Sequence, residues 1–258
     1  MKSYFKYFTI HLKSQLEYRL SFVMTMLGQF LVSFGGVFGV YFMFQRFHEV
    51  DGFTMHESLL CYSVVIAGFA LSETFARGFD LFPRLVRSGE LDRILVRPRS
   101  LIFQILVSEI EFARLGKLFQ AAVVMAYAIP NSGVVWNLTN VFVYMLMIFS
   151  GFVIFTSVFI LYAGVSFFTV EGLEFMNIFT HGGKTFGEYP YSIYGEGALK
   201  FVTYVIPIAL FQYYPFLYIT GRETGMANAL APVFGCLFII PCLAFWCFGL
   251  SRYKSTGS

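Results

Sequence analysis

LFQAAVVMAYAIPNSGVVWNLTNVFVYMLMIFSGFVIFTSVFILYAGVSFFTV, residues 118–170, contains no Asp, Glu, Lys or Arg over 53 residues. A helix needs about 20 apolar residues to cross the hydrocarbon core of a bilayer. The stretch is therefore too long for one crossing and suits two. The Pro-Asn-Ser-Gly turn signal at Pro130–Gly133 falls between the two halves.

The composition of the whole chain agrees with this interpretation. Of its 258 residues, 57% are hydrophobic and 13% are charged, whereas soluble domains carry about 25% charged residues. The apolar runs are continuous and do not alternate, which argues against a β-barrel. We predict an all-α membrane protein, with a single transmembrane domain over residues 1–258. The six predicted spans are Ser21–Phe44, Ser58–Ala76, Glu109–Ile129, Leu138–Val165, Phe201–Ile219 and Ala229–Leu250.

The basic residues are divided unevenly between the two sides that these spans imply. With the N-terminus placed in the cytoplasm, 16 of the 18 Lys and Arg residues fall in inside segments, and only Arg46 and Arg222 fall outside. Basic residues collect in cytoplasmic loops. We therefore expect both termini in the cytoplasm, with cytoplasmic loops over residues 77–100 and 166–200. The excess of basic charge reflects this topology and contact with lipid headgroups, and gives no basis for nucleic-acid binding.

The first 19 residues have the spacing of an amphipathic helix. Phe5, Phe8, Leu12 and Leu16 recur at helical intervals. A helix of this kind beside a span lies along the membrane surface. We expect an interfacial helix over residues 1–19, and the alternative is a polar leader that continues into the first span.

Two glycines in the first span, Gly35 and Gly39, form a GxxxG pair. Small residues four positions apart allow helix backbones to approach closely. The pair is a candidate for packing against another span of the chain or against a partner subunit.

The third predicted span begins with four charged residues: Glu109, Glu111, Arg114 and Lys117. Glu111 and Arg114 are spaced to pair on one helix face. We expect the helix to start before the membrane, near Pro98 or Ser100, which would leave these charges at the cytoplasmic rim. Buried charges also mark transport pathways, so a pathway role is the alternative.

The fifth predicted span is interrupted by Pro207 and Pro215, with Gln212 and Tyr213 between them. Proline removes a backbone donor and bends a helix. In a membrane such breaks persist where a neighbour or a cavity satisfies the released carbonyl groups. These four residues are candidates for a moving or cavity-lining element, and a simple packing kink explains them equally well.

The sequence offers no catalytic, cofactor or metal site. Gly183-Lys184-Thr185 resembles the end of a phosphate-binding loop, but Ile178 stands where that motif requires glycine. The four histidines fall in separate loops or helix ends, and no pair of carboxylates is expected in mid-membrane. We expect that the chain is not an enzyme and binds no cofactor or metal.

The predicted loop over residues 77–100 reads as a compact helical hairpin. Leu85 belongs to the apolar face of its first helix, Ser88-Gly89 ends that helix, and a second turn begins with acidic residues, as the helix dipole favours. Pro98 ends the second turn. A surface of apolar residues with a charged rim suits docking into a groove of a cytoplasmic partner. The alternative is a basic loop that only fixes topology.

Four segments carry a resemblance to a known family: GELDRILVRPRS (89–100), EYPYSIYG (188–195), IPIALFQYYPFLYITG (206–221) and FGLSRYKSTGS (248–258). They resemble the ABC-2 type permeases, in the six-span branch with a G-x-L-D-x-x-L-x-R-P loop. The resemblance extends over most of the chain. It implies the membrane subunit of an ATP-driven exporter in a bacterial-type plasma membrane.

The resemblance also implies partners and a coupling loop. Two permease subunits, identical or related, would pair with two cytoplasmic ATPase subunits that hold the ATP and Mg²⁺. The loop between the second and third spans would act as the coupling helix at the ATPase interface. Its matching residues are Gly89, Leu91, Asp92, Arg93, Leu95, Arg97 and Pro98.

The substrate is not named by the sequence, although the apolar, aromatic interior favours an amphipathic or lipid-like molecule. The alternative function is a self-sufficient secondary transporter or channel. Such a protein is expected to show inverted repeats and an ionisable group near the bilayer midplane, and neither is evident in the sequence.

Overall fold

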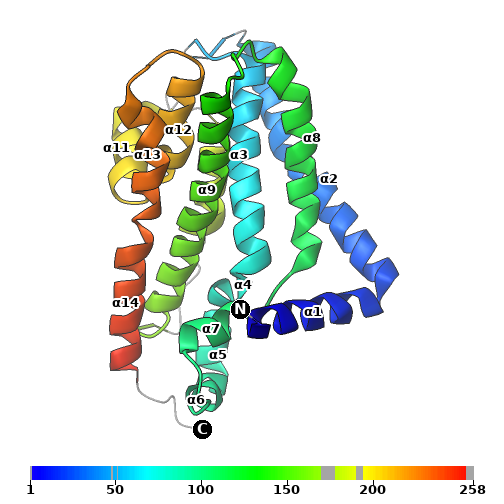
Figure 1. Cartoon of the computed structure of the whole chain (residues 1–258), viewed down its shortest axis with the longest axis vertical. Coiled ribbons are helices and arrows are strands. Elements are labelled where there is room, and N and C mark those ends of the chain that lie inside the picture. The colour runs from blue at the N-terminus through cyan, green and yellow to red at the C-terminus, as the bar shows by residue number, and fades with distance from the viewer. Residues whose placement is uncertain (1, 48, 51, 170–177, 190–193, 254–258) are drawn as a thin grey trace.

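The computed structural model describes residues 2–47, 49–50, 52–169, 178–189 and 194–253, and these residues form helices without a β-strand (Figure 1). The elements are α1 (Lys2–Glu17), α2 (Arg19–Arg46), α3 (Met55–Phe75), α4 (Arg77–Asp80), α5 (Phe82–Arg87), α6 (Glu90–Leu95), α7 (Leu101–Leu106), η1 (Phe112–Arg114), α8 (Leu115–Asn131), α9 (Leu138–Val165), η3 (Ile178–Gly182), α10 (Gly183–Gly187), α11 (Gly195–Tyr204), α12 (Ile208–Ile219), α13 (Met226–Cys236) and α14 (Ile239–Arg252).

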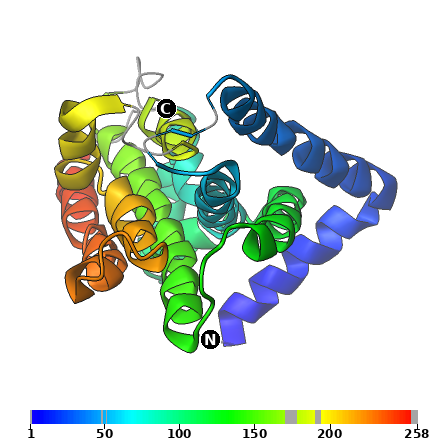
Figure 2. The ribbon, with the colours of Figure 1, turned by 90° about the horizontal axis from the view of Figure 1, so that it is seen from above.

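Helix α3 is the centre of the bundle. It begins at a capping box, in which the Thr54 side chain accepts from the Glu57 backbone N–H and the Glu57 side chain accepts from the Thr54 N–H. The helix is buried along almost its whole length and lies between α8 and α9, as the view along the bundle shows (Figure 2). Because protein neighbours bury it on all sides, α3 is the element around which the others pack.

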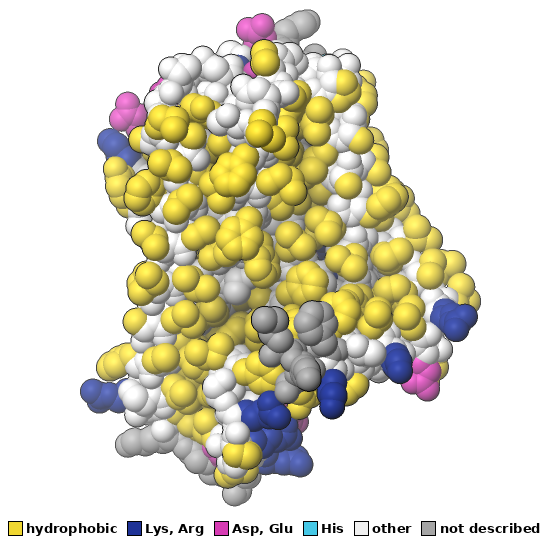
Figure 3. Space-filling model, in the orientation of Figure 1, with side chains coloured by type: hydrophobic (Ala, Val, Ile, Leu, Met, Phe, Trp, Pro, Cys, Tyr) yellow, Lys and Arg dark blue, Asp and Glu magenta, His cyan; other side chains and the backbone are white. Residues whose placement is uncertain are grey.

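Helices α2 and α14, at the two sides of the bundle, carry many exposed apolar side chains. Lys and Arg gather mainly at the end of the molecule that holds α4–α7, which we call the basic end, while apolar side chains cover the height above it (Figure 3). Within the described residues, five helical segments are long and apolar enough to cross a membrane, and a sixth is counted when the bent pair α11–α12 is taken as one span. The chain is a multi-pass α-helical membrane protein.

Helix α1 lies across the basic end and turns sharply into α2 (Figure 1). Its apolar side contacts the segment before α8: the Phe8 and Phe112 rings meet edge to face at 4.8 Å. Its Gln15 amide also bonds the same segment, where Gln15 Oε1 accepts from the Phe112 N–H at 3.0 Å. The amphipathic pattern thus corresponds to a helix that is held to the rest of the chain through Phe8 and Gln15.

The predicted span Phe201–Ile219 is not one straight helix. Helices α11 and α12 meet at an angle of 112°, and Pro207 is the residue that precedes α12. Pro215 lies inside α12 without breaking it. The predicted bend is therefore present at the first proline and absent at the second.

The described part of residues 166–200, predicted as a cytoplasmic loop, is partly helical and packs against the bundle. The η3–α10 segment packs against α3 and α12, and the His181 ring meets the Phe69 ring of α3 edge to face at 5.4 Å. Residues 170–177 and 190–193 lie outside the described residues. Basic charge suggested an exterior position for this segment, but Lys184 finds its partner, Glu188, within the segment itself.

Of the two glycines predicted as packing residues, Gly39 does pack against the chain, but Gly36 takes the place of Gly35. A side chain at Gly35 would meet nothing within 4 Å, so this glycine faces away from the described chain. A Cβ at Gly36 would collide with the Tyr62 ring and lie 2.8 Å from Glu188 Oε2, and one at Gly39 would collide with the Tyr189 hydroxyl. The small face that packs inward is therefore Gly36 and Gly39.

Candidate functional site

Four short helices, α4 to α7, build a compact hairpin at the basic end. Gly89 separates α5 from α6 with φ of +72°, a conformation that glycine adopts without a steric penalty. Glu90 and Asp92 occupy the first turn of α6, where the helix dipole favours acidic side chains. The predicted hairpin is thus present, and it continues beyond residue 100 to the end of α7.

The hairpin is anchored to the membrane helices by aromatic packing. Phe82 of α5 is fully buried and lies 6.1 Å from the Trp246 ring of α14 and 5.2 Å from the Phe167 ring. Phe79 of α4 contacts the same tryptophan at 6.2 Å. These ring contacts attach the base of the hairpin to α14 and to the residues after α9.

Leu91, predicted as a docking residue, does not face outward. It is 0% exposed and belongs to the main hydrophobic core, because α6 turns this side chain towards the bundle. Asp92 and Leu85 are half-buried. The side chains of this stretch that face outward are Leu95, 41% exposed, and Val96, 83% exposed. Arg93, Arg97 and Pro98 are exposed beside them.

The expected continuous helix from Ser100 into the third span is interrupted. Helix α7 ends at Leu106, and the chain is extended before η1 begins at Phe112. The backbone groups of the break find partners elsewhere: the Glu111 N–H donates to the Thr74 carbonyl at the end of α3 at 3.2 Å, and His11 contacts the Val107 carbonyl at 2.9 Å. The break leaves Glu109 exposed, outside any helix.

An ion network joins the hairpin to this break. Arg77 of α4 pairs with Asp80 and also lies 3.3 Å from the Glu111 carboxylate. Burial raises the pKa of Asp80 above its ordinary value of 3.8, although the Arg77 guanidinium lowers it. Arg77 therefore contacts carboxylates on two different segments and links the hairpin to the start of the third span.

The network continues into the membrane helices. Arg114 Nε lies 3.1 Å from the Glu111 carboxylate, as the i,i+3 spacing predicted, and Arg114 Nη1 lies 3.5 Å from Glu73 of α3. Glu73 is fully buried, and the Lys117 ammonium of α8 lies 2.5 Å from its carboxylate. The four charges that the sequence placed at a solvated rim are thus divided: Glu109 is exposed, and the other three are in a shared network.

A second buried ion pair lies deeper in the bundle. Lys184 Nζ is 2.8 Å from Glu188 Oε1, and Glu188 is 5% exposed. Glu188 adjoins Gly36, which is ten residues from the end of α2 at Arg46, about 15 Å along a helix. A carboxylate at mid-height was not expected from the sequence. The only local signal was the i,i+4 spacing of Lys184 and Glu188.

The fifth-span residues contact this deeper region. Gln212 is fully buried, and its Nε2 donates to the Gly187 carbonyl at 3.3 Å. Its Oε1 has no hydrogen-bond partner among the described residues. Tyr213 is half-buried beside it. Gln212 therefore ties α12 to the segment that carries Glu188, immediately after the bend at Pro207.

Among the described residues, no group of three or more His, Cys, Asp or Glu side chains is placed to hold a metal ion. Searches among curated proteins and among solved structures found no match. A family profile described as "ABC-2 family transporter protein" matches residues 30–257. Since this match covers well over half of the chain, the chain belongs to the ABC-2 transporter family and is a membrane component of an ABC transporter.

Proposed function

We propose that the chain is the permease subunit of an ATP-driven exporter and that its α4–α7 hairpin receives the movement of a separate ATPase. Membership of the ABC-2 family implies association with ABC ATPase subunits. The observation that carries the proposal is that the hairpin has an exposed apolar tip and a base that is bonded to the membrane helices. It exposes Leu95 and Val96 at its tip, while its base is joined to the spans through Arg77.

The ion network gives this proposal a mechanical basis. A displacement of α4 moves Arg77, and Arg77 is linked through Glu111 and Arg114 to Glu73 on α3. Glu73 is in turn held by Lys117 on α8. Buried charges resist separation because an unpaired charge in a low-dielectric interior is unfavourable. The network therefore favours joint movement of hairpin, α3 and α8.

The assembly we propose contains two permease subunits, identical or related, and two ATPase subunits that bind ATP and Mg²⁺. The chain itself hydrolyses nothing. The coupling surface consists of Arg93, Leu95, Val96, Arg97 and Pro98, with Gly89 shaping the turn. The location is a bacterial-type plasma membrane with the basic end in the cytoplasm, and the substrate is amphipathic or lipid-like and moves outward.

The α11–α12 bend is the proposed moving part on the substrate side. Pro207 lacks the N–H that would continue the helix. The side-chain oxygen Oε1 of Gln212 is buried and accepts no hydrogen bond from the part of the chain that the structure describes. An unpaired buried acceptor is unfavourable, which supports a second arrangement of α12 in which this oxygen gains a partner.

One observation favours a second candidate, a secondary transporter driven by an ion gradient. Glu188 is an ionisable group at mid-height, as such a transporter requires. Its pairing with Lys184 neutralises it within the chain, so the ATP-driven mechanism remains the proposal.

Reconstitution into proteoliposomes separates the two candidates. The permease would be purified with its ATPase and assayed for release of substrate-like fluorescent lipid under ATP or under an imposed proton gradient. The proposal predicts transport with ATP and none with the gradient alone. Transport by the permease without any ATPase would refute it and support the secondary transporter.

A further inference from the structure

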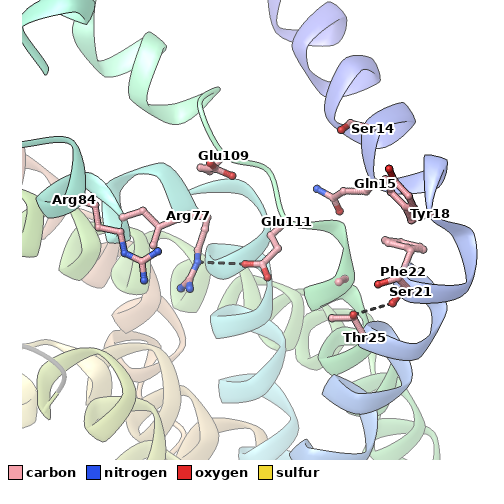
Figure 4. Close-up of a pocket in the computed structure, with 12 residues that line it drawn as sticks. Ser14, Gln15, Tyr18, Ser21, Phe22, Thr25, Arg77, Arg84, Glu109 and Glu111 are labelled. Atoms are coloured by element: carbon pink, nitrogen blue, oxygen red, sulfur yellow. Dashed lines mark hydrogen bonds and ion pairs between the residues drawn. The ribbon is translucent and has the colours of Figure 1, made fainter. Parts of the chain in front are cut away.

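A cleft of about 520 Å³ opens at the basic end between α1 with the start of α2 on one side and the hairpin on the other (Figure 4). Ser14, Gln15 and Tyr18 of the α1–α2 corner face Arg77 and Arg84 of the hairpin across it. The extended segment before α8 forms a third wall and contributes Glu109 and Glu111.

Charges of both signs line this cleft, and two of them are uncompensated. Arg77 and Glu111 pair with each other at 3.3 Å. Arg84 and Glu109 are exposed, and neither side chain has a hydrogen bond or ion pair to another described residue. One free cation and one free anion in the same cleft match a ligand that itself carries one charge of each sign.

The position of the cleft identifies the ligand as a lipid. Helix α1 lies across the basic end of a bundle whose apolar surface begins immediately above it (Figures 1 and 3), and an amphipathic helix in this position lies at headgroup level. Phe22 and Leu81 add apolar surface to the cleft, next to the hydroxyl groups of Ser21 and Thr25. Such a lining suits a polar headgroup whose acyl chains continue along α2.

We propose that this cleft binds the headgroup of a zwitterionic aminophospholipid from the cytoplasmic leaflet, with its phosphate at Arg84 and its primary ammonium at Glu109. Guanidinium groups are strong partners for phosphate. A primary ammonium donates three hydrogen bonds, whereas the trimethylammonium of a choline lipid donates none. An anionic lipid without an amine would leave Glu109 unmatched and would face the carboxylate of Glu111. The inference does not depend on the proposed ATPase coupling.

Binding there would add a second connection between α1 and the hairpin. At present the Tyr7 ring of α1 meets the Phe103 ring of α7 edge to face at 6.2 Å, and His11 and Gln15 bond the chain between α7 and α8. A headgroup held at once by the Ser14 hydroxyl of α1 and by Arg84 would extend the connection to α5.

Native mass spectrometry of the purified chain tests the proposal directly, with phosphatidylethanolamine, phosphatidylcholine and phosphatidylglycerol titrated into the micelles. Phosphatidylethanolamine should bind about tenfold more tightly than either competitor, since each charge-assisted hydrogen bond that is lost weakens binding by about this factor. Arg84→Gln and Glu109→Gln should each remove this preference. Lys13→Gln and Glu17→Gln make the same charge changes on the exposed side of α1, outside the cleft, and should preserve it.

Two control experiments test whether the ligand is a lipid or a soluble headgroup, and whether the variants remain folded. Soluble glycerophosphoethanolamine at the same concentration should fail to displace the lipid, and the Tm of each variant in detergent should match that of the unmodified chain. Equal binding of all three lipids, an unchanged preference in Arg84→Gln and Glu109→Gln, or displacement by the soluble headgroup would overturn the proposal. A variant with a lowered Tm would be replaced by Arg84→Lys, which should retain charge and lose only part of the preference.

Discussion

The ammonium of Lys117 on α8 lies 2.5 Å from the carboxylate of Glu73 on α3, and that carboxylate is fully buried. Both residues lie close to the basic end of their helices, at the level where the hairpin joins the bundle (Figure 1). The pair thus connects the two membrane helices at the place where movement of an ATPase would enter. It also explains why a mostly apolar chain retains charges inside its helical bundle.

Removing one member of this pair should destabilise the protein strongly. Lys117→Met keeps the apolar stem and removes the charge, which leaves Glu73 with only the more distant Arg114. We expect a loss of about 3 kcal/mol of unfolding free energy, measured by denaturation in detergent.

The matched control is Lys200→Met. Lys200 pairs with Glu196, and both side chains are largely exposed. Exposed pairs contribute about 0–1 kcal/mol. The double variant Glu73→Gln/Lys117→Met should recover part of the lost stability. An equal effect of the two single lysine changes would show that the buried pair has no special role.

The two leucines of α6 should behave in opposite ways. Leu91→Ala leaves a cavity in the core and should lower stability by about 2–5 kcal/mol. Leu95→Ala removes an exposed side chain and should change stability by no more than about 0.5 kcal/mol, yet reduce copurification of the ATPase. Thermal unfolding and pull-down yield, measured on the same preparations, separate the two effects. Normal ATPase recovery with Leu95→Ala would argue against this surface.

Adjacent glycines in α2 provide another contrast. Gly36→Ala should lower the Tm, since its Cβ would meet Tyr62 and Glu188. Gly35→Ala places its Cβ in open space and should leave the Tm unchanged or slightly raised, as alanine favours the helix. The reverse order of Tm values would place the packing face on Gly35.

The raised pKa of Asp80 predicts how the stability of the protein depends on pH. Its folded-state pKa is raised above 3.8 by burial, so the folded state binds a proton at a pH where the unfolded state does not. The contribution of Asp80 to the free energy of unfolding therefore increases as the pH falls through the folded-state pKa. This increase is complete below pH 3.8, the pKa of the unfolded state. The Tm difference between Asp80→Asn and the unmodified chain should shift in favour of the unmodified chain as the pH is lowered from 7 towards 4. A constant difference would contradict the assignment.

The membrane fold could be predicted from sequence because continuous apolar runs leave a helical bundle as the main option. The spans near α2, α3, α8 and α9 agree with the structure to within a few residues, and the bend at Pro207 follows from the missing backbone donor. The family resemblance in the hairpin sequence agrees with the family match over residues 30–257.

The side-chain arrangement could not be predicted in the same way. Leu91 and Leu95 are equally apolar, and only the rotation of a six-residue helix decides which one is buried. The sequence predicts a solvated position for Lys184 and Glu188. It does not reveal that their segment folds back against α3. The network at Glu73 depends on residues brought together from α3, η1 and α8, whose proximity is a property of the tertiary fold.

Site-specific photo-crosslinking at Val96 tests the central claim most directly. p-Benzoylphenylalanine would be placed at Val96, 83% exposed at the hairpin tip, and at Val135, 74% exposed between α8 and α9 at the opposite end. On illumination of native membranes, the account predicts a covalent adduct between position 96 and an ABC ATPase subunit, identified by mass spectrometry, and no such adduct from position 135. Absence of an ATPase adduct at position 96, or equal yields from both positions, would contradict it.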